Sequence, residues 1–206
     1  LMSYRQAAYD EWPRTGIPRL FEDELEYQRY VGTLVRARAI PDESFIWWSI
    51  RPSSRYPTIE LRITDSCPRV IDAVCIAELF RVAVLQECLD ADRVDATSLR
   101  DGIERLLIEE NRWRAKRFGV RAKWLDAESG LNIDLSDCLS QLARRCANAV
   151  GELQADWAFD HARRVIAEGS SAERQRRVFS EGRAAGLTTA RALRRVVQAL
   201  VQETRG

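Results

Sequence analysis

The stretch Ile50–Asp65, I-R-P-S-S-R-Y-P-T-I-E-L-R-I-T-D, holds two short runs typical of β-strands on either side of a loop with two prolines. In the second run, from Thr58 to Thr64, apolar and polar residues alternate, so Glu60 and Arg62 lie side by side on one face of the strand. Antiparallel sheets often bury one face and leave the other in water. The pattern alone therefore favours an ordinary ion pair on a solvated surface.

A neighbouring strand is predicted at Phe45–Arg51, where the same alternation places Arg51 on the polar face. The connection Pro52–Pro57 is longer than a two-residue hairpin turn, so the sequence leaves open whether the two strands are immediate neighbours. If they pair antiparallel with matching faces, Arg51, Glu60 and Arg62 converge on one patch.

Helical patterns occupy most of the remaining chain. The most apolar stretch, Val70–Leu89, predicts a helix that is central to the packing and lies across the apolar face of the sheet. A further helix is predicted over Ser98–Phe118, with Thr97 as its N-cap and Gly119 as a left-handed stop. The fold class expected from these patterns is α+β, a partial antiparallel sheet packed by helices.

The end of the chain is predicted to be entirely helical. Two short strands, Val120–Leu125 and Leu131–Leu135, come first and are joined around a turn at Gly130. Helices are then expected at Ser136–Gln154, Asp156–Glu168, Ser171–Ala185 and Thr188–Thr204. We therefore divide the chain into residues 1–135, with sheet and packing helices, and a helical region, residues 136–206.

Composition argues against several classes of function. Lys and Arg number 32 against 31 Asp and Glu, and the resulting net charge of +1 gives no electrostatic reason to expect nucleic acid or an anionic membrane as partner. The stretch Val70–Leu89 carries too many charges for a membrane span. The single histidine, His161, excludes a cluster of His ligands, and five cysteines without C-x-x-C spacing indicate reduced thiols. A soluble cytoplasmic protein is expected.

Several motifs occur in a recognisable order. These are S-Y-R at Ser3–Arg5, W-P-R-T-G-I-P at Trp12–Pro18, the run from Trp47 to Asp65, and E-N-R-W-R-A-K-R-F-G at Glu110–Gly119. Together they resemble the carboxylate-amine ligases of the glutamate-cysteine ligase type 2 family, over nearly the whole chain. The resemblance implies a fold like that of glutamine synthetase, whose concave polar sheet face forms the active site. It also implies an ATP-dependent reaction, through an acyl-phosphate, that joins the carboxylate of an amino acid to an amine.

The resemblance also implies roles for individual residues. Glu60 is expected to bind Mg²⁺, which prefers carboxylate oxygens alongside phosphate and water. Arg62 and Arg51 are expected to contact the ATP phosphates or the acyl-phosphate, since a guanidinium stabilises the charge of phosphoryl transfer. Arg5 is expected to hold a substrate carboxylate. Two more residues match family positions, and substrate contact and structural bracing remain open for both: Asn111 and Arg117.

Members of this family begin with a further section, nearly as long again, that supplies other strands and most of the acidic metal ligands. This chain starts inside the S-Y-R motif, so we expect a C-terminal portion, incomplete without an N-terminal half, with open sheet edges where the missing strands would pair. A homo-oligomer is possible. The alternative function is a non-catalytic interaction or regulatory module that retains part of the fold, and a guanidino-kinase-like phosphotransferase is a more distant one.

Overall fold

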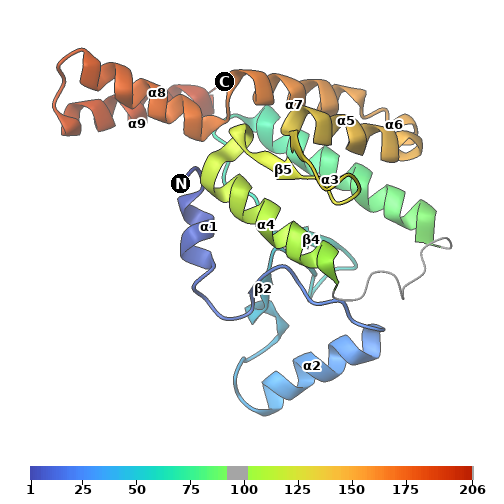
Figure 1. Ribbon diagram of the computed structural model, residues 1–206. Coiled ribbons are helices and arrows are strands. Elements are labelled where there is room, and N and C mark those ends of the chain that lie inside the picture. The colour runs from blue at the N-terminus through green and yellow to red at the C-terminus, as the bar shows by residue number, and fades with distance from the viewer. Residues whose placement is uncertain (92–101, 206) are drawn as a thin grey trace. The chain divides into compact units, whose positions relative to one another are not determined.

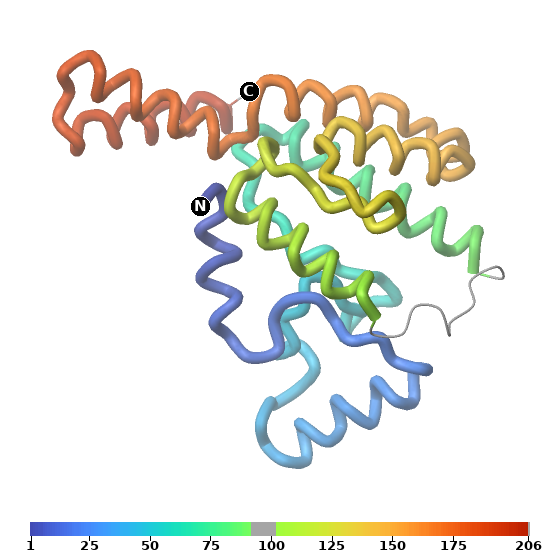
Figure 2. Tube along the Cα trace, in the orientation of Figure 1, coloured from blue at the N-terminus to red at the C-terminus, as the bar shows by residue number. Residues whose placement is uncertain are grey.

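The computed structural model describes residues 1–91 and 102–205, which form two compact units interleaved along the chain (Figures 1 and 2). The strand unit comprises residues 4–65 and, among those described, 102–110. The helical unit comprises residues 1–3 and, among those described, 66–91 and 111–205. Helix α4 (Ile103–Phe118) belongs to both. The predicted division at residue 135 remains a prediction.

Short strands and two helices make up most of the strand unit. Strand β1 pairs in parallel with β2, and β3 pairs antiparallel with β4. Its core is aromatic and aliphatic, with Phe21, Tyr30 and Leu34 packed against a buried cluster of Tyr27, Val31, Ile40, Ile46 and Trp48. The elements are α1 (Tyr4–Tyr9), β1 (Thr15–Gly16), α2 (Glu24–Arg36), η1 (Glu43–Phe45), β2 (Trp47–Trp48), β3 (Ile50–Pro52) and β4 (Ile59–Leu61).

The strand predicted at Phe45–Arg51 is broken in two, because its halves pair with different partners. On one side of the break, the N–H of Trp47 donates to Arg14 O at 2.8 Å, and Ser49 N–H donates to Gly16 O at 2.7 Å. Beyond Ser49 the chain pairs with β4 instead. Thr15 and Gly16 therefore form the short strand β1.

Helices dominate the helical unit. The longest, α3 (Val70–Asp90), packs against α6 and α7. The core is formed where α5, α6 and α7 meet α3, by Val82, Leu139, Cys146, Ala149, Val150, Ala155 and Phe159. The other elements are η3 (Gly119–Arg121), β5 (Lys123–Leu125), β6 (Asn132–Asp134), α5 (Leu135–Arg145), α6 (Ala147–Leu153), α7 (Asp156–Glu168), α8 (Ser171–Ala184) and α9 (Thr189–Arg205).

Most of the predicted helices are confirmed. The exception is Ser136–Gln154, which was predicted as one helix and is two, with a break at Cys146. No glycine or proline marks this break. Leu139 of α5 and Ala149 of α6, on either side of the break, both belong to the core cluster that includes Val82. The start of the helix predicted over Ser98–Phe118, with its cap at Thr97, lies outside the described residues.

Helices α8 and α9 form an antiparallel hairpin (Figure 1). A capping box begins α8, in which the Ser170 side chain and backbone N–H both meet the Glu173 carboxylate. Before the capping box, Gly169 has a backbone φ of 99°, a conformation that residues other than glycine rarely adopt. The predicted hairpin of β5 and β6 is also confirmed, and pairs Trp124 with Ile133.

The described residues form an α+β fold with three two-stranded sheets. None of the helices within residues 1–91 and 102–205 has the length and apolarity that crossing a bilayer requires. All five cysteines are free thiols. Their surroundings differ, because Cys75 and Cys146 are buried while Cys88 is exposed. Burial raises the pKa of the Cys75 thiol to about 11.

Candidate functional site

The register of β3 and β4 brings three of the predicted site residues together. Arg51 lies directly opposite Glu60 in the antiparallel pair, and Arg62 follows two residues after Glu60. The N–H of Arg62 donates to Ser49 O at 2.8 Å, which extends the pairing by one step beyond β4. We call Arg51, Glu60 and Arg62 the β3–β4 patch. Its existence confirms the convergence that the alternation predicted under antiparallel pairing.

Arg51 is the buried member of the patch, with 8% of its surface exposed. Its Nη1 donates to Ile46 O at 2.5 Å and to Ser44 O at 2.7 Å. Its Nε donates to Glu60 Oε2 at 3.1 Å. The guanidinium thus joins the 3₁₀ turn η1 to the strand pair, and in this arrangement it braces the patch and fixes the Glu60 carboxylate.

Glu60 lies between two guanidinium groups. Its Oε2 accepts from Arg51 and, at 3.2 Å, from Nη1 of Arg62. Partial burial tends to raise the pKa of the carboxyl, but the charges and hydrogen bonds of Arg51 and Arg62 outweigh it, so the pKa of Glu60 is lowered. The carboxylate therefore stays ionised and holds both arginines on the same face.

Arg62 differs from Arg51 in having donor capacity to spare. Its Nε is buried and meets no hydrogen-bond acceptor among the described residues. A buried N–H without an acceptor is costly, and such groups call for a partner. The side chain as a whole is 28% exposed, so an anion can reach the guanidinium from solvent, although Nε itself is buried. The chemistry of this donor fits a phosphate or carboxylate oxygen.

Two side chains of helix α1 donate hydrogen bonds to the backbone carbonyls of Arg62 and Ile63. Arg5 Nη1 donates to Arg62 O at 3.2 Å, and its guanidinium lies 4.5 Å from the centre of the Tyr9 ring. The next residue, Gln6, is buried and donates to Ile63 O at 2.6 Å. The structure thus adds Arg5 to the surroundings of the patch. Gln6 was missed, since a single glutamine in a short helix carries no pattern.

Asn111 and Arg117 belong to the helical unit, whereas the patch belongs to the strand unit. The Asn111 amide pairs with the backbone of Leu125, with Nδ2 donating to O and N–H donating to Oδ1, both at 2.8 Å. Both ends of the amide are thereby used to join α4 to β5, which is structural bracing. Arg117 is exposed and lies 5.8 Å from the centre of the Phe118 ring.

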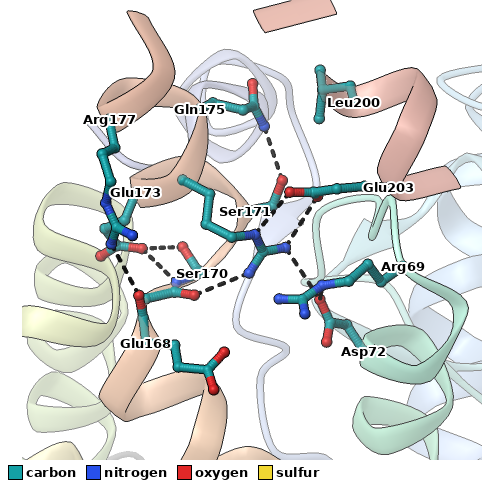
Figure 3. A network of polar contacts seen from close by, with 12 residues as sticks. Arg69, Asp72, Glu168, Ser170, Ser171, Glu173, Gln175, Arg177, Leu200 and Glu203 are labelled. Atoms are coloured by element: carbon teal, nitrogen blue, oxygen red, sulfur yellow. Dashed lines mark hydrogen bonds and ion pairs between the residues drawn. The ribbon is translucent and has the colours of Figure 1, made fainter. Parts of the chain in front are cut away.

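A second polar cluster, centred on Asp72, was not predicted (Figure 3). Asp72 Oδ1 lies 2.8 Å from His161 Nε2, and its Oδ2 lies 3.3 Å from Arg69 Nε and 3.5 Å from Arg174 Nη2. Arg174 also binds Glu203 through Nε at 3.0 Å. We call these five residues the Asp72 cluster. It joins α3, α7, α8 and α9, and gives His161 a structural hydrogen bond to Asp72.

The residues described fit a phosphate group of ATP better than they fit Mg²⁺. The spare donor of Arg62 fits a phosphate. In residues 1–91 and 102–205, however, no three His, Cys, Asp or Glu side chains gather so as to hold a metal ion. Glu60 is a single carboxylate between two cations, so the residues described do not complete a Mg²⁺ site.

Comparison with known proteins places these motifs in one family. The family model described as Glutamate-cysteine ligase family 2 matches residues 1–199. Proteins named "Putative glutamate--cysteine ligase 2" are similar over almost the whole chain. The one from Ectopseudomonas mendocina is 44% identical over 204 residues, covering 99% of this chain and 53% of its own length. The one from Rhodospirillum rubrum is 42% identical over 204 residues, covering 99% and 52%.

The chain spans about half the length of these curated relatives, consistent with a C-terminal portion. The match of the family model covers both the strand unit and the helical unit, and includes the β3–β4 patch. This chain belongs to glutamate-cysteine ligase family 2.

Proposed function

We propose that this chain is the C-terminal part of an ATP-dependent carboxylate-amine ligase of the glutamate-cysteine ligase kind, with a glutamine synthetase-like fold. Membership of the family and the names of the relatives support the ligase class. The observation that carries the proposal is the buried, unpartnered Nε of Arg62 on a strand face that it shares with Glu60. A half-buried cation with a free donor is suited to phosphoryl chemistry.

The proposed reaction has two steps. An oxygen of the substrate carboxylate attacks the γ-phosphorus of ATP, which forms an acyl-phosphate and releases ADP. The amine nitrogen then attacks the acyl carbon, the bond from carbon to the phosphate oxygen breaks, and an amide and inorganic phosphate result. Arg62 stabilises the negative charge on the transferring phosphoryl group, because its charge is permanent and its position is fixed by Glu60 and α1.

The other predicted residues take different positions in this proposal. Arg51 positions Glu60, and reaches phosphate only if it gives up one of its backbone carbonyls. Arg5 is proposed for a substrate carboxylate, with its stacking on Tyr9 leaving the guanidinium beside the patch. Asn111 braces α4 against β5, and Arg117 remains a proposed substrate contact.

The proposed partner is the part of the ligase that precedes this chain in the family. We propose that it supplies the carboxylates that a Mg²⁺ site needs beside Glu60, since Mg²⁺ in phosphate sites usually takes one or two carboxylates plus water. The amino acid and the amine are small molecules, and the family resemblance does not choose between glutamate with cysteine and other pairs.

The test joins the first half of the Ectopseudomonas mendocina relative to this chain and measures ADP release with glutamate and cysteine, then with other amino acids. ADP that depends on both substrates is the expected result. If no pair of amino acids gives ADP from a folded joined protein, the proposal is wrong.

The site assignment has its own control. Arg62→Ala should lower turnover by about two orders of magnitude, as expected for removal of a group that stabilises transition-state charge. The matched control is Arg55→Ala, since Arg55 is an exposed arginine in the loop between β3 and β4. Equal turnover in the two variants would remove Arg62 from the site.

One observation favours the alternative, a non-catalytic module. The Arg51 guanidinium donates to Glu60 and to the backbone carbonyls of Ser44 and Ile46, which is a bracing role. Calorimetry separates the two functions. A ligase portion binds Mg-ATP once the joined protein is complete, whereas a non-catalytic module binds it neither alone nor joined.

A further inference from the structure

Helix α3 buries two polar side chains beside Cys75 and Val82, and it exposes apolar side chains in its first turns. Its inner side carries Asp72 and Gln86, which are 9% and 3% exposed. Both are satisfied, Asp72 by its cluster and Gln86 by contacts to Asp90 and to the N–H of Ala149. The inner side therefore already has its partners.

The outer side of the first turns is apolar. Val70 and Val74 are 72% and 46% exposed, and Ile71 beside them is 45% exposed. Residues three or four positions apart share one face of a helix. The exposed Ala73 and Ala77 therefore lie on the same strip as Val70 and Val74. We call these five residues the α3 apolar patch: Val70, Ile71, Ala73, Val74 and Ala77. The charge of Arg81, one turn further on, ends it.

We propose that the α3 apolar patch is the docking surface for the half of a family 2 ligase that this chain does not span. An apolar strip free of charged side chains selects an apolar partner surface, because an unpaired charge buried against it would be costly. A helix that is apolar on most of its circumference is normally covered on both sides. The relatives are about twice as long as this chain, so the family has a further segment large enough to cover the patch.

The identity of the occupant rests on the proposed function, but the contact does not require activity. A thiol placed in the patch reports whether the patch is covered, whether or not the joined protein releases ADP. Failure of the ligase reaction and failure of the docking proposal are therefore separate results.

The experiment compares Val74→Cys with Leu89→Cys, each in a Cys88→Ser background. Leu89 is the matched control, since it lies on the same helix outside the patch and is 45% exposed against 46% for Val74. Iodoacetamide labelling, located by mass spectrometry, is measured on this chain and on the chain joined to the first half of the Ectopseudomonas mendocina relative. Joining should slow labelling at position 74 by about tenfold or more and leave position 89 within about twofold.

Each contrary labelling result points to a different environment for the α3 apolar patch. Protection of position 74 in the chain by itself, at low concentration, would mean that the rest of the chain covers the patch. Protection that grows with concentration would indicate a second copy. Equal labelling of position 74 before and after joining would mean that the patch stays in water. Any of these overturns the proposal.

Buried Cys75 reports folding within the same molecule, because its thiol should stay unlabelled in a folded protein. If the joined protein labels at Cys75, the two halves are instead coexpressed as separate polypeptides and copurified. Val70→Glu with Val74→Glu should then abolish copurification that Leu89→Glu retains. Copurification that survives the double variant, or that fails for the unaltered chain, overturns the proposal.

Discussion

The β3–β4 patch and the Asp72 cluster both hold a carboxylate between arginines. They differ in whether the guanidinium nitrogens of those arginines all have an acceptor. In the Asp72 cluster, Arg174 donates through Nε to Glu203, through Nη1 to Gly169 O, and through Nη2 to Asp72 and Glu203. Every nitrogen of that guanidinium has an acceptor. In the patch, the buried Nε of Arg62 has no acceptor among the described residues. The buried Nε of Arg69 in the Asp72 cluster also makes no hydrogen bond, but it lies 3.3 Å from Asp72 Oδ2 in an ion pair.

This difference in hydrogen bonding separates a structural polar network from a candidate binding site. A buried guanidinium whose donors are all satisfied, such as that of Arg174, fixes the positions of helices and has nothing to gain from a ligand. A network with an unsatisfied buried donor is less stable than it could be, and a ligand can remove that deficit. The presence of arginines and acids does not distinguish the two, but their remaining hydrogen-bonding capacity does.

The largest expected effect is in the Asp72 cluster. Asp72→Asn removes the charge that holds Arg69, Arg174 and His161, and should lower the free energy of unfolding by about 3 kcal/mol, as for other broken buried ion pairs. Denaturant unfolding measures this. In the patch, Glu60→Gln should cost less than about 1 kcal/mol. If the two costs are equal, burial does not separate the two networks.

The next comparison concerns the arginines. Arg174→Ala should lower the free energy of unfolding by about 2 kcal/mol, because Asp72 and Glu203 lose a partly buried partner. Arg62→Ala should change it by less than about 0.5 kcal/mol, since an unsatisfied donor is removed together with one hydrogen bond. A loss of stability in Arg62→Ala as large as in Arg174→Ala would assign Arg62 to structure.

The smallest expected effect is the dependence of stability on pH in the patch. The pKa of Glu60 is lower in the folded state than in the unfolded state, because Arg51 and Arg62 favour its charged form over the effect of burial. Its contribution is therefore fully present above the unfolded pKa and is lost as pH falls through the folded pKa. The stability difference between the unaltered chain and Glu60→Gln should shrink from pH 7 to pH 3. A difference that grows would reverse the sign of the shift.

The sequence determined the polar face of the patch, because side chains alternate along a strand whatever surrounds it. Glu60 and Arg62 were therefore placed together correctly, and Arg51 joined them once the strands paired. The split of the strand at Ser49 was not predictable, since it depends on which segments pair with each half. In the same way, the α+β class followed from local patterns, whereas the interleaved units did not.

What only the tertiary structure decided is which polar groups have partners. Asp72 and His161 are 89 residues apart, and no local pattern connects them. Helix α3 is apolar nearly all round, so its sequence does not say which side is buried, and the buried side proved to be the one with Asp72. Periodicity is a property of one segment, while burial and hydrogen bonding depend on contacts between segments. For that reason the sequence alone could name Arg62 as a candidate, but only the fold showed that it has a donor to spare.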